Sequence, residues 1–376
     1  MTKEKSKILI LNSGSTSLKF KIFDNDKNEF ANGIIEKIGL QKSIINLDGK
    51  IDHYKVLNHK EALNIIKNKF QNIKFDFIVH RIVHGGSEFI KPVTLNESII
   101  EKIKKYNDLA PLHNPINLST AQESLSIWKN VKQFGAFDTM FFSTLEEKVY
   151  TYPINWSFRK KYNIRKFGFH GFSHQKMLED SAKILNKKTS ECNLITCHLG
   201  GGSSISAIKN GKAIEISMGF TPNSGVMMLT RSGDIDSSII NFLNKKHNIS
   251  IESVDKMLNF ESGIKGISKL DDLRDVMILN GYRIKSYKTH IKANNNNKKI
   301  AKLALDMFIY RIQRYISSYI TLMPNIDAIV FSGGIGERNA DIRKLIFKDL
   351  YINKKIKTIV IKANEELAIL NSIIKK

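Results

Sequence analysis

The sequence KILILNSGSTSLK at residues 7–19 gives the clearest indication of the fold. An apolar run leads into a turn of small and polar residues, and an alternating stretch then continues to Phe23. This pattern predicts a β-hairpin at residues 8–23 with its tight turn at residues 13–17. A turn with few large side chains exposes backbone N–H groups, which suit anionic oxygens.

Two further turns of the same kind follow apolar strand patterns later in the chain. HLGGGSS, residues 198–204, follows the run at 194–197, and SGGIGE, residues 332–337, follows the run at 328–331. Three such turns, each at the carboxyl end of a strand, predict that a nucleotide phosphate tail is held between two domains. The chemistry that this arrangement favours is phosphoryl transfer.

Length and composition favour a two-domain globular protein. The 376 residues exceed what one hydrophobic core usually serves, and 42% hydrophobic with 25% charged residues is typical of folded chains. The pattern of alternating strands and helices breaks around Tyr150–Pro153. We therefore place the domain boundary there, between a first domain at 1–150 and a second at 151–363.

Several classes of protein are not favoured by the sequence. The basic start at residues 1–7 is followed by an apolar run too short for a signal peptide, and no later stretch approaches a membrane span. Cys192 and Cys197 are expected to be ordinary thiols in a reducing cytoplasm. The net charge of +23 comes from lysines scattered along the chain, so neither nucleic acid nor a membrane is expected as a partner.

The remaining periodicities predict alternating strands and helices. Apolar residues at three- and four-residue spacing from Leu305 to Met323 indicate a long amphipathic helix, and Asn210-Gly211 indicates a hairpin turn. The order of strand, small-residue turn and strand recurs at residues 194–208. An internal duplication of the first hairpin would produce this recurrence. The other expected elements are helices at 60–70 and 117–129 and strands at 75–79, 131–137 and 328–331.

Positively charged residues stand where a phosphate could be bound. Lys19 lies just past the first turn, and Arg81, Arg231 and Arg274 each lie beside glycine or aspartate residues. Such arginines suit planar or tetrahedral oxyanions. The pair His170 and His174 has the spacing of a zinc site only on a continuous helix, and the intervening Gly171 argues against one; hydrogen bonding to a phosphoryl oxygen is the favoured use of His170.

Taken together, these residues resemble the acetate kinase family, within the superfamily of sugar kinases, actin and heat-shock chaperone ATPases. The resemblance runs from Lys7 to Leu367. Its motifs are NSGSTSLKF, HRIVHGG, LAPLHNP, FDTMF, FGFHGFSH, TCHLGGGSS, TRSGDID, FSGGIGE and NEEL. The resemblance implies an α/β fold of two duplicated actin-like or ribonuclease H-like domains with a cleft between them. It also implies that a C-terminal helix at 364–376 packs back on the first domain.

The resemblance further implies ATP or ADP as co-substrate, Mg²⁺ as the metal (which Mn²⁺ could replace) and a homodimer. The implied metal ligands are Asn12 and Glu365, and the implied catalytic residues are Asp138, His170 and Arg231. The acceptor would be bound by Arg81 and by an apolar pocket of Val83, Leu112, Phe169 and Pro222. The nucleotide would be bound by Lys19, His198, Leu199, Gly200, Gly201, Gly202, Asp272, Leu273, Arg274, Gly334, Ile335, Gly336, Glu337 and Arg338.

Asp138 is the acid or base that the family pattern suggests, but a carboxylic acid acceptor is already ionised at neutral pH and needs no base. We therefore expect Asp138 to orient metal-bound water or a histidine or arginine partner. The sequence also departs from the family pattern. Gly201 replaces an asparagine, Phe172 a threonine, Asn223-Ser224 a Leu-Glu pair and Arg338 an asparagine.

Three functions remain open from sequence. The first is an acetate kinase that forms acetyl phosphate and ADP reversibly by direct in-line transfer. The second is a propionate or butyrate kinase on the same scaffold, because one methylene in an apolar pocket changes discrimination by only about 10–200-fold. The third is a chaperone ATPase or a nucleic-acid-binding protein; the first of these would need an appended peptide-binding domain and the second a contiguous basic face.

Overall fold

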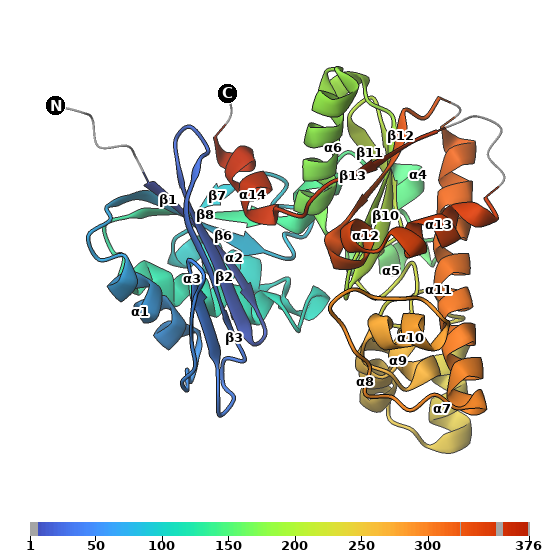
Figure 1. The fold of residues 1–376 in the computed structure, drawn as a ribbon. Helices are drawn as coiled ribbons and strands as arrows, with labels where there is room; N and C mark the ends of the chain where they lie inside the picture. Colours follow the sequence, from blue (N-terminus) through green and yellow to red (C-terminus); the bar gives the residue numbers. More distant parts are fainter. Residues whose placement is uncertain (1–6, 324, 351–355, 375–376) are drawn as a thin grey trace. The chain divides into compact units, whose positions relative to one another are not determined.

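The computed structural model describes residues 7–323, 325–350 and 356–374. The basic start at residues 1–6 lies outside these ranges. The chain divides into two compact units: unit 1 comprises Met1–Ser143 with Asn364–Lys376, and unit 2 comprises Thr144–Ala363. The sequence placed the division at residue 150, and the terminal segment at 364–376 does group with unit 1. Each unit contains one mixed β-sheet with helices, which is the α/β class that the sequence predicts (Figure 1).

Unit 1 is built on an eight-stranded sheet of order β5-β4-β3-β2-β1-β6-β8-β7. Neighbours from β1 to β5 pair antiparallel, whereas β6 is parallel to β1 and β8 is parallel to β6. The parallel pairing brings the carboxyl ends of β1, β6 and β8 to one edge, and the first turn lies there. The strands are β1 (Lys7–Gly14), β2 (Ser17–Asp24), β3 (Glu29–Glu36), β4 (Ile44–Leu47), β5 (Lys50–Asp52), β6 (Phe75–Ile82), β7 (Val93–Thr94) and β8 (Lys132–Phe137).

The helices of unit 1 begin at clear capping signals. Asn58 accepts a hydrogen bond from the Glu61 backbone N–H at the start of α1, and Asn96 does the same for Ile99 at the start of α2. Helix α3 contacts β1 and β6, and α14, from the far end of the chain, contacts the same two strands (Figure 1). The helices are α1 (His59–Lys69), α2 (Glu97–Lys104), α3 (Asn114–Ile127) and α14 (Glu365–Ile373), with 3-10 turns η1 at Asn107–Leu109 and η2 at Asp138–Phe142.

Unit 2 is built on a five-stranded sheet of order β11-β10-β9-β12-β13. The hairpin β9–β10 with β12 parallel to β9 repeats the arrangement of β1–β2 with β6 parallel to β1. This shared pattern is what an internal duplication would produce. The strands are β9 (Leu194–Leu199), β10 (Ser203–Lys209), β11 (Lys212–Ile216), β12 (Ala328–Ser332) and β13 (Lys357–Val360).

The helices of unit 2 are numerous and mostly short, apart from α6 and α11. They are α4 (Glu147–Tyr150), α5 (Trp156–Lys161), α6 (Gly171–Leu185), α7 (Ser238–His247), α8 (Ile251–Phe260), α9 (Gly263–Ser268), α10 (Leu273–Leu279), α11 (Asn295–Leu322), α12 (Gly333–Arg338) and α13 (Ala340–Lys348), with a 3-10 turn at Thr189–Glu191. Among the described helices, none combines the length and apolar composition that crossing a bilayer requires.

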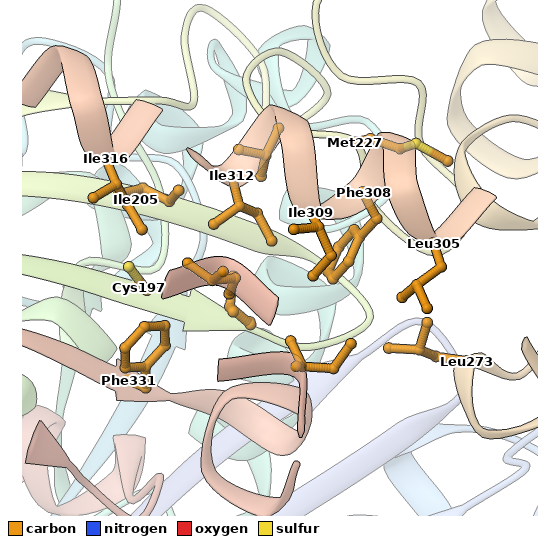
Figure 2. Packing of buried hydrophobic residues seen from close by; sticks show 14 of the residues in the cluster. Cys197, Ile205, Met227, Leu273, Leu305, Phe308, Ile309, Ile312, Ile316 and Phe331 are labelled. Carbon is orange, nitrogen blue, oxygen red and sulfur yellow. The ribbon is translucent and has the colours of Figure 1, made fainter. Parts of the chain in front are cut away.

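Alternate side chains of strand β9 contact different neighbours, so both faces of the strand are covered. Ile195, Cys197 and Leu199 belong to the core that the buried stripe of α11 completes, as Figure 2 shows for Cys197 and several α11 residues. Thr196 and His198 point the other way, toward hydrogen-bond partners on α6. The two-residue period of a strand therefore separates a packing face from a polar face. The polar face carries candidate site residues.

The predicted elements are largely confirmed, with two differences. Strand β6 continues to Ile82, three residues past its expected end, and so carries Arg81 itself. The glycine turn after β12 is instead the first turn of α12, because Gly333 takes a positive φ of 78° that lets the chain pass directly from strand to helix. The Asn210-Gly211 turn is confirmed, with positive φ at both residues as a type I′ hairpin requires.

Candidate active-site clusters

The described part of unit 1 gathers three of the predicted residues, Asp138, Asn12 and Glu365, around the guanidinium of Arg81, at the end of β6. Its Nε and Nη2 donate to the two carboxylate oxygens of Asp138 at 3.1 and 2.6 Å. Its Nη1 donates to the amide oxygen of Asn12 at 3.1 Å and lies 3.1 Å from a carboxylate oxygen of Glu365. Asp138 follows β8 directly, so adjacent parallel strands place the two members of this pair side by side.

Glu366, which the sequence analysis did not single out, completes this cluster. Its carboxylate is fully buried, accepts a hydrogen bond from the Asn12 amide nitrogen at 3.1 Å and lies 2.9 Å from the ammonium of Lys19. With an acceptor on one side and a donor on the other, the Asn12 amide has a single orientation, its oxygen toward Arg81. The available signal was the second glutamate of the NEEL motif, which directly follows the predicted ligand Glu365.

Burial and charge compete in setting the protonation of these groups. Burial alone would lower the pKa of Arg81, but the carboxylates of Asp138, Glu365 and Glu366 together raise it above its ordinary value. Burial raises the pKa of the Asp138 carboxyl, the Arg81 guanidinium opposes this shift, and Glu365 adds to it. The bidentate contact holds the positive guanidinium of Arg81 against the Asp138 carboxylate. Each charge therefore stabilises the other at a position that little water reaches.

The cluster has the composition of a site for a hard cation. When ionised, the carboxylates of Asp138, Glu365 and Glu366 outnumber the two positive charges of Lys19 and Arg81 by one. The oxygens of Asn12 and Glu365 converge on the same Arg81 nitrogen, and carboxylate and amide oxygens are the donors that Mg²⁺ accepts. Mg²⁺ usually takes only one or two carboxylates and completes its shell with water and phosphate, so Asn12 and Glu365 fit it. The described residues hold no cluster of three or more histidine, cysteine or acidic side chains suited to a metal.

A second group of predicted residues meets in unit 2, around His170. This residue takes a left-handed backbone conformation with φ of 60° at the N-cap of α6. Such a conformation is uncommon outside glycine and concentrates at functional sites. The ring of His170 lies with its centroid 4.3 Å from that of His198, and its Nδ1 is 2.9 Å from the Ser204 hydroxyl. Helix α6 begins at Gly171, so His170 lies just outside the helix that carries His174, and the two histidines do not share one continuous helix.

Gly202 lies next to both His170 and Arg231. A Cβ added to Gly202 would lie 3.3 Å from Nε2 of His170 and 3.4 Å from Nη1 of Arg231. The missing side chain therefore leaves the space that these two donors border. Arg231 is oriented by the Pro222 carbonyl at 3.2 Å, and burial lowers its pKa.

The turn from His198 to Gly202 lies beside the start of α12. The Gly200 N–H donates to the Gly202 carbonyl at 3.0 Å, and a Cβ on Gly200 would lie 3.9 Å from the backbone nitrogen of Gly334. A Cβ added to Gly201 or to Gly334 would meet no heavy atom of the described residues within 4 Å, apart from its own chain neighbours, so both backbones are open. These two predicted nucleotide segments are thus adjacent within unit 2.

The predicted adenosine-side residues divide into exposed and buried side chains. Asp272 caps α10 and pairs with Arg274, whose guanidinium lies 4.0 Å from the ring of Tyr287. Glu337 accepts a hydrogen bond from the Ala363 backbone and pairs with the exposed Arg338. Leu199 and Leu273 are packed in the core of unit 2, Gly336 is buried, and Ile335 packs partly buried against that core. Of the two leucines, only the backbone could contact a nucleotide.

The four predicted acceptor-pocket residues are shared between the units. In unit 1, Val83 is buried and Leu112 is exposed, whereas in unit 2 Phe169 is buried and Pro222 is half-buried. Each unit by itself therefore holds two of them.

Comparison with known proteins assigns nearly the whole chain to one protein family. Residues 7–364 match the model of the acetokinase family. The acetate kinase of Borreliella burgdorferi is 41% identical and the match covers 98% of both chains. The crystal structure of the Porphyromonas gingivalis acetate kinase has a TM-score of 0.84 at 32% identity, covering 97% of this chain and 98% of that one. A propionate kinase structure from Francisella tularensis has a TM-score of 0.87 at 35% identity, covering 98% of each chain.

Proposed function

The chain belongs to the acetokinase family, and from this premise we propose that it transfers the γ-phosphoryl group of ATP to acetate. The products are acetyl phosphate and ADP, and the reaction is reversible. The observation that carries the proposal is the cluster in unit 1, where Arg81 is held by Asp138, Glu365 and Asn12. Four residues from four separate segments, β1, β6, η2 and α14, meet there around one guanidinium.

The acceptor carboxylate attacks the phosphorus directly. Because acetate is ionised at neutral pH, no residue has to remove a proton from it. A carboxylate oxygen forms a bond to the γ-phosphorus while the bond from that phosphorus to the bridging oxygen breaks, and the electron pair leaves on ADP. The protein contributes alignment and charge stabilisation rather than covalent chemistry.

We assign Arg81 to the acceptor carboxylate and Asp138 to the orientation of Arg81. A guanidinium carries five N–H donors, and the four contacts to Asp138, Asn12 and Glu365 leave it able to bind one more oxygen. Asp138 is thus a positioning residue and not a base. The apolar residues Val83, Leu112, Phe169 and Pro222 would receive the acceptor methyl group.

We assign His170 and Arg231 to the oxygens of the transferred phosphoryl group, on which negative charge redistributes in the transition state. Lys19 and the turn at His198–Gly202 would bind the phosphate tail of the nucleotide. The adenosine end would be bound by residues 272–274 and 334–338. Mg²⁺, held by Asn12 and Glu365, would neutralise charge on the nucleotide phosphates.

The setting of the reaction follows from the family resemblance. We propose a cytoplasmic homodimer that binds neither nucleic acid nor a membrane. Sedimentation of the purified protein in analytical ultracentrifugation would give the dimer mass if this is right.

A hydroxamate assay tests the function directly. The protein is incubated with ATP, Mg²⁺ and acetate, propionate or butyrate, and hydroxylamine traps the acyl phosphate. We expect product with acetate, less with butyrate, and strong loss in Arg81→Gln but not in the control Arg314→Gln, which changes another arginine on α11 of unit 2. A higher kcat/KM for propionate than for acetate would instead support the second function, in line with the similarity to a propionate kinase. Absence of product from every acid would reject both.

A further inference from the structure

Two short segments of unit 2, a first at 167–170 and a second at 219–222, meet at Gly219. The Gly219 carbonyl accepts hydrogen bonds from the backbone N–H groups of Phe167 and Gly168, at 3.0 and 3.3 Å. All three residues are buried, so little water competes for these contacts. The backbones of the two segments are therefore held directly against each other.

This junction connects four of the predicted site residues. The first segment carries Phe169 and His170, which immediately follow the hydrogen-bonded glycine. The second segment carries Pro222, whose carbonyl accepts a hydrogen bond from Nη1 of Arg231 at 3.2 Å. The placement of His170 relative to Arg231, and of Phe169 relative to Pro222, therefore depends in part on the junction.

Tyr152 also contacts the second segment. Its hydroxyl oxygen accepts a hydrogen bond from the Phe220 backbone N–H at 2.8 Å. A Cβ added to Gly219 would lie 2.2 Å from that oxygen, so a larger residue there would displace the hydroxyl or the backbone. The side chain of Tyr152 is half-buried, and burial raises the pKa of its hydroxyl, which therefore stays neutral.

The backbone next to Tyr152 is tied to the start of the first segment. The Lys166 N–H, directly before that segment, donates to the carbonyl of Tyr150 at 2.8 Å. The side chain of Tyr152 thus starts from a backbone beside the first segment and ends on the second segment. It forms another connection between the two segments, in addition to the one at Gly219.

We propose that Tyr152 is a positioning residue, which through Phe220 and Pro222 fixes the guanidinium of Arg231 in relation to His170. The two donors border one space, because a Cβ on Gly202 would lie 3.3 Å from Nε2 of His170 and 3.4 Å from Nη1 of Arg231. A small movement of the second segment would therefore change how a ligand is bound between them. The use of this space for a phosphoryl group rests on the proposed function.

Tyr152→Phe tests the role of the hydroxyl, because it keeps the ring and removes the acceptor of the Phe220 N–H. We expect kcat to fall about tenfold with KM for acetate little changed, since small misplacements of oriented groups cost up to roughly 100-fold in rate. The matched control is Tyr319→Phe. Tyr319 is buried in the core of the same unit, and its hydroxyl has no hydrogen-bond partner among the described residues, so its loss should leave kcat unchanged.

A double-mutant cycle separates positioning from a general loss of structure. If Tyr152 acts through Arg231, then Tyr152→Phe in an Arg231→Gln background should lower kcat by no more than about threefold. An equal loss in both backgrounds would overturn the proposal. So would an unchanged kcat in Tyr152→Phe when Arg231 is intact.

Hydrogen exchange of backbone amides gives a readout that does not require catalysis. In Tyr152→Phe we expect the Phe220 N–H to exchange at least about tenfold faster, and the Phe167 N–H to exchange faster as well, because the second segment is held less firmly. Tyr319→Phe should change neither rate. Unchanged exchange at Phe220 in Tyr152→Phe would overturn the proposal. If exchange behaves as expected but the unmodified protein forms no acyl phosphate, the proposed function fails while the connection through Tyr152 stands.

Discussion

The carboxylate of Glu366 lies 2.9 Å from the ammonium of Lys19, although the two residues are 347 positions apart. Glu366 is fully buried at the start of the last helix, whereas the Lys19 side chain is partly exposed on the second strand. The same carboxylate also receives a hydrogen bond from Asn12. The two ends of the chain are thus joined by one acidic group at the edge of the unit 1 sheet.

Removing the charge of Glu366 should loosen this connection. We expect Glu366→Gln to lower the free energy of unfolding by about 1–3 kcal/mol, because the ion pair between the buried carboxylate and Lys19 is lost. The loss is limited because the partly exposed Lys19 can turn to water. Urea unfolding followed by circular dichroism measures the change. The variant should also raise KM for ATP, since Lys19 and Asn12 lose their fixed positions.

The control for this variant is Glu29→Gln. Glu29 pairs with Lys21 at 2.6 Å, also on the second strand, but both partners are partly exposed. Its loss should cost at most about 1 kcal/mol and leave KM for ATP unchanged. Equal effects of the two substitutions would mean that burial of Glu366 contributes nothing.

Substitution of Asp138 should act through Arg81. In Asp138→Asn, the amide nitrogen would face one of the guanidinium donors, so at most one of the two contacts can persist. We expect kcat to fall by roughly 100-fold and the Mg²⁺ concentration for half-maximal rate to rise, since Arg81 also contacts the oxygens of Asn12 and Glu365. Magnesium titrations of the initial rate measure both effects.

A strong loss of turnover with an unchanged Mg²⁺ requirement would contradict this account of Asp138. It would leave a direct role in the chemical step as the better explanation.

Two buried histidines should make unit 1 sensitive to acid. Burial lowers the pKa of His80 to about 4, against which its hydrogen bond to Gln133 acts, and burial lowers the pKa of His84 to about 3. Because the folded pKa lies below the unfolded value near 6.5, the unfolded chain binds protons first as the pH falls. Stability is therefore full above pH 6.5 and declines toward pH 4, by about 2 kcal/mol per histidine between pH 7 and pH 5.

The two tryptophans allow this decline to be followed in unit 1. Trp128 lies in unit 1 and the exposed Trp156 in unit 2, so Trp156→Phe leaves Trp128 as the reporter. In that background, His80→Asn should remove about half of the difference in unfolding free energy between pH 7 and pH 5. The same pH dependence with and without His80 would show that other groups control the acid response.

Adjacent glycines should respond differently to alanine. Gly202→Ala would place its Cβ 3.2–3.4 Å from His170 and Arg231, so we expect kcat to fall at least about tenfold as both donors shift. Gly201→Ala has no described neighbour within 4 Å and should change the free energy of unfolding by about 0.5 kcal/mol or less and kcat less than twofold.

Thermal unfolding and initial rates measured on both variants test this contrast. Gly201→Asn, the residue that the family pattern has there, should be tolerated as well as alanine. Comparable losses in the two alanine variants would show that the space at Gly202 is not what positions His170 and Arg231.

The sequence by itself determined the elements and most of the residues gathered in each cluster. Apolar runs ending in glycine and serine identify β1, β9 and β12 because strand periodicity and turn chemistry are local properties. The stripe from Leu305 to Met323 likewise fixes α11, whose face must be buried somewhere. The motif resemblance pointed to Arg81, Asp138, His170 and Arg231 before any coordinates.

Tertiary structure alone decided the partners of these side chains. No local pattern could pair Lys19 with Glu366 or connect Thr196 to His170 through His174 and Ser204, because hydrogen bonds between distant segments depend on strand order and register. It also decided that Leu199 and Leu273 point into the core, since burial depends on which helix covers each face. Sequence patterns record local preferences, whereas the environment of each charge is created only when the segments pack together.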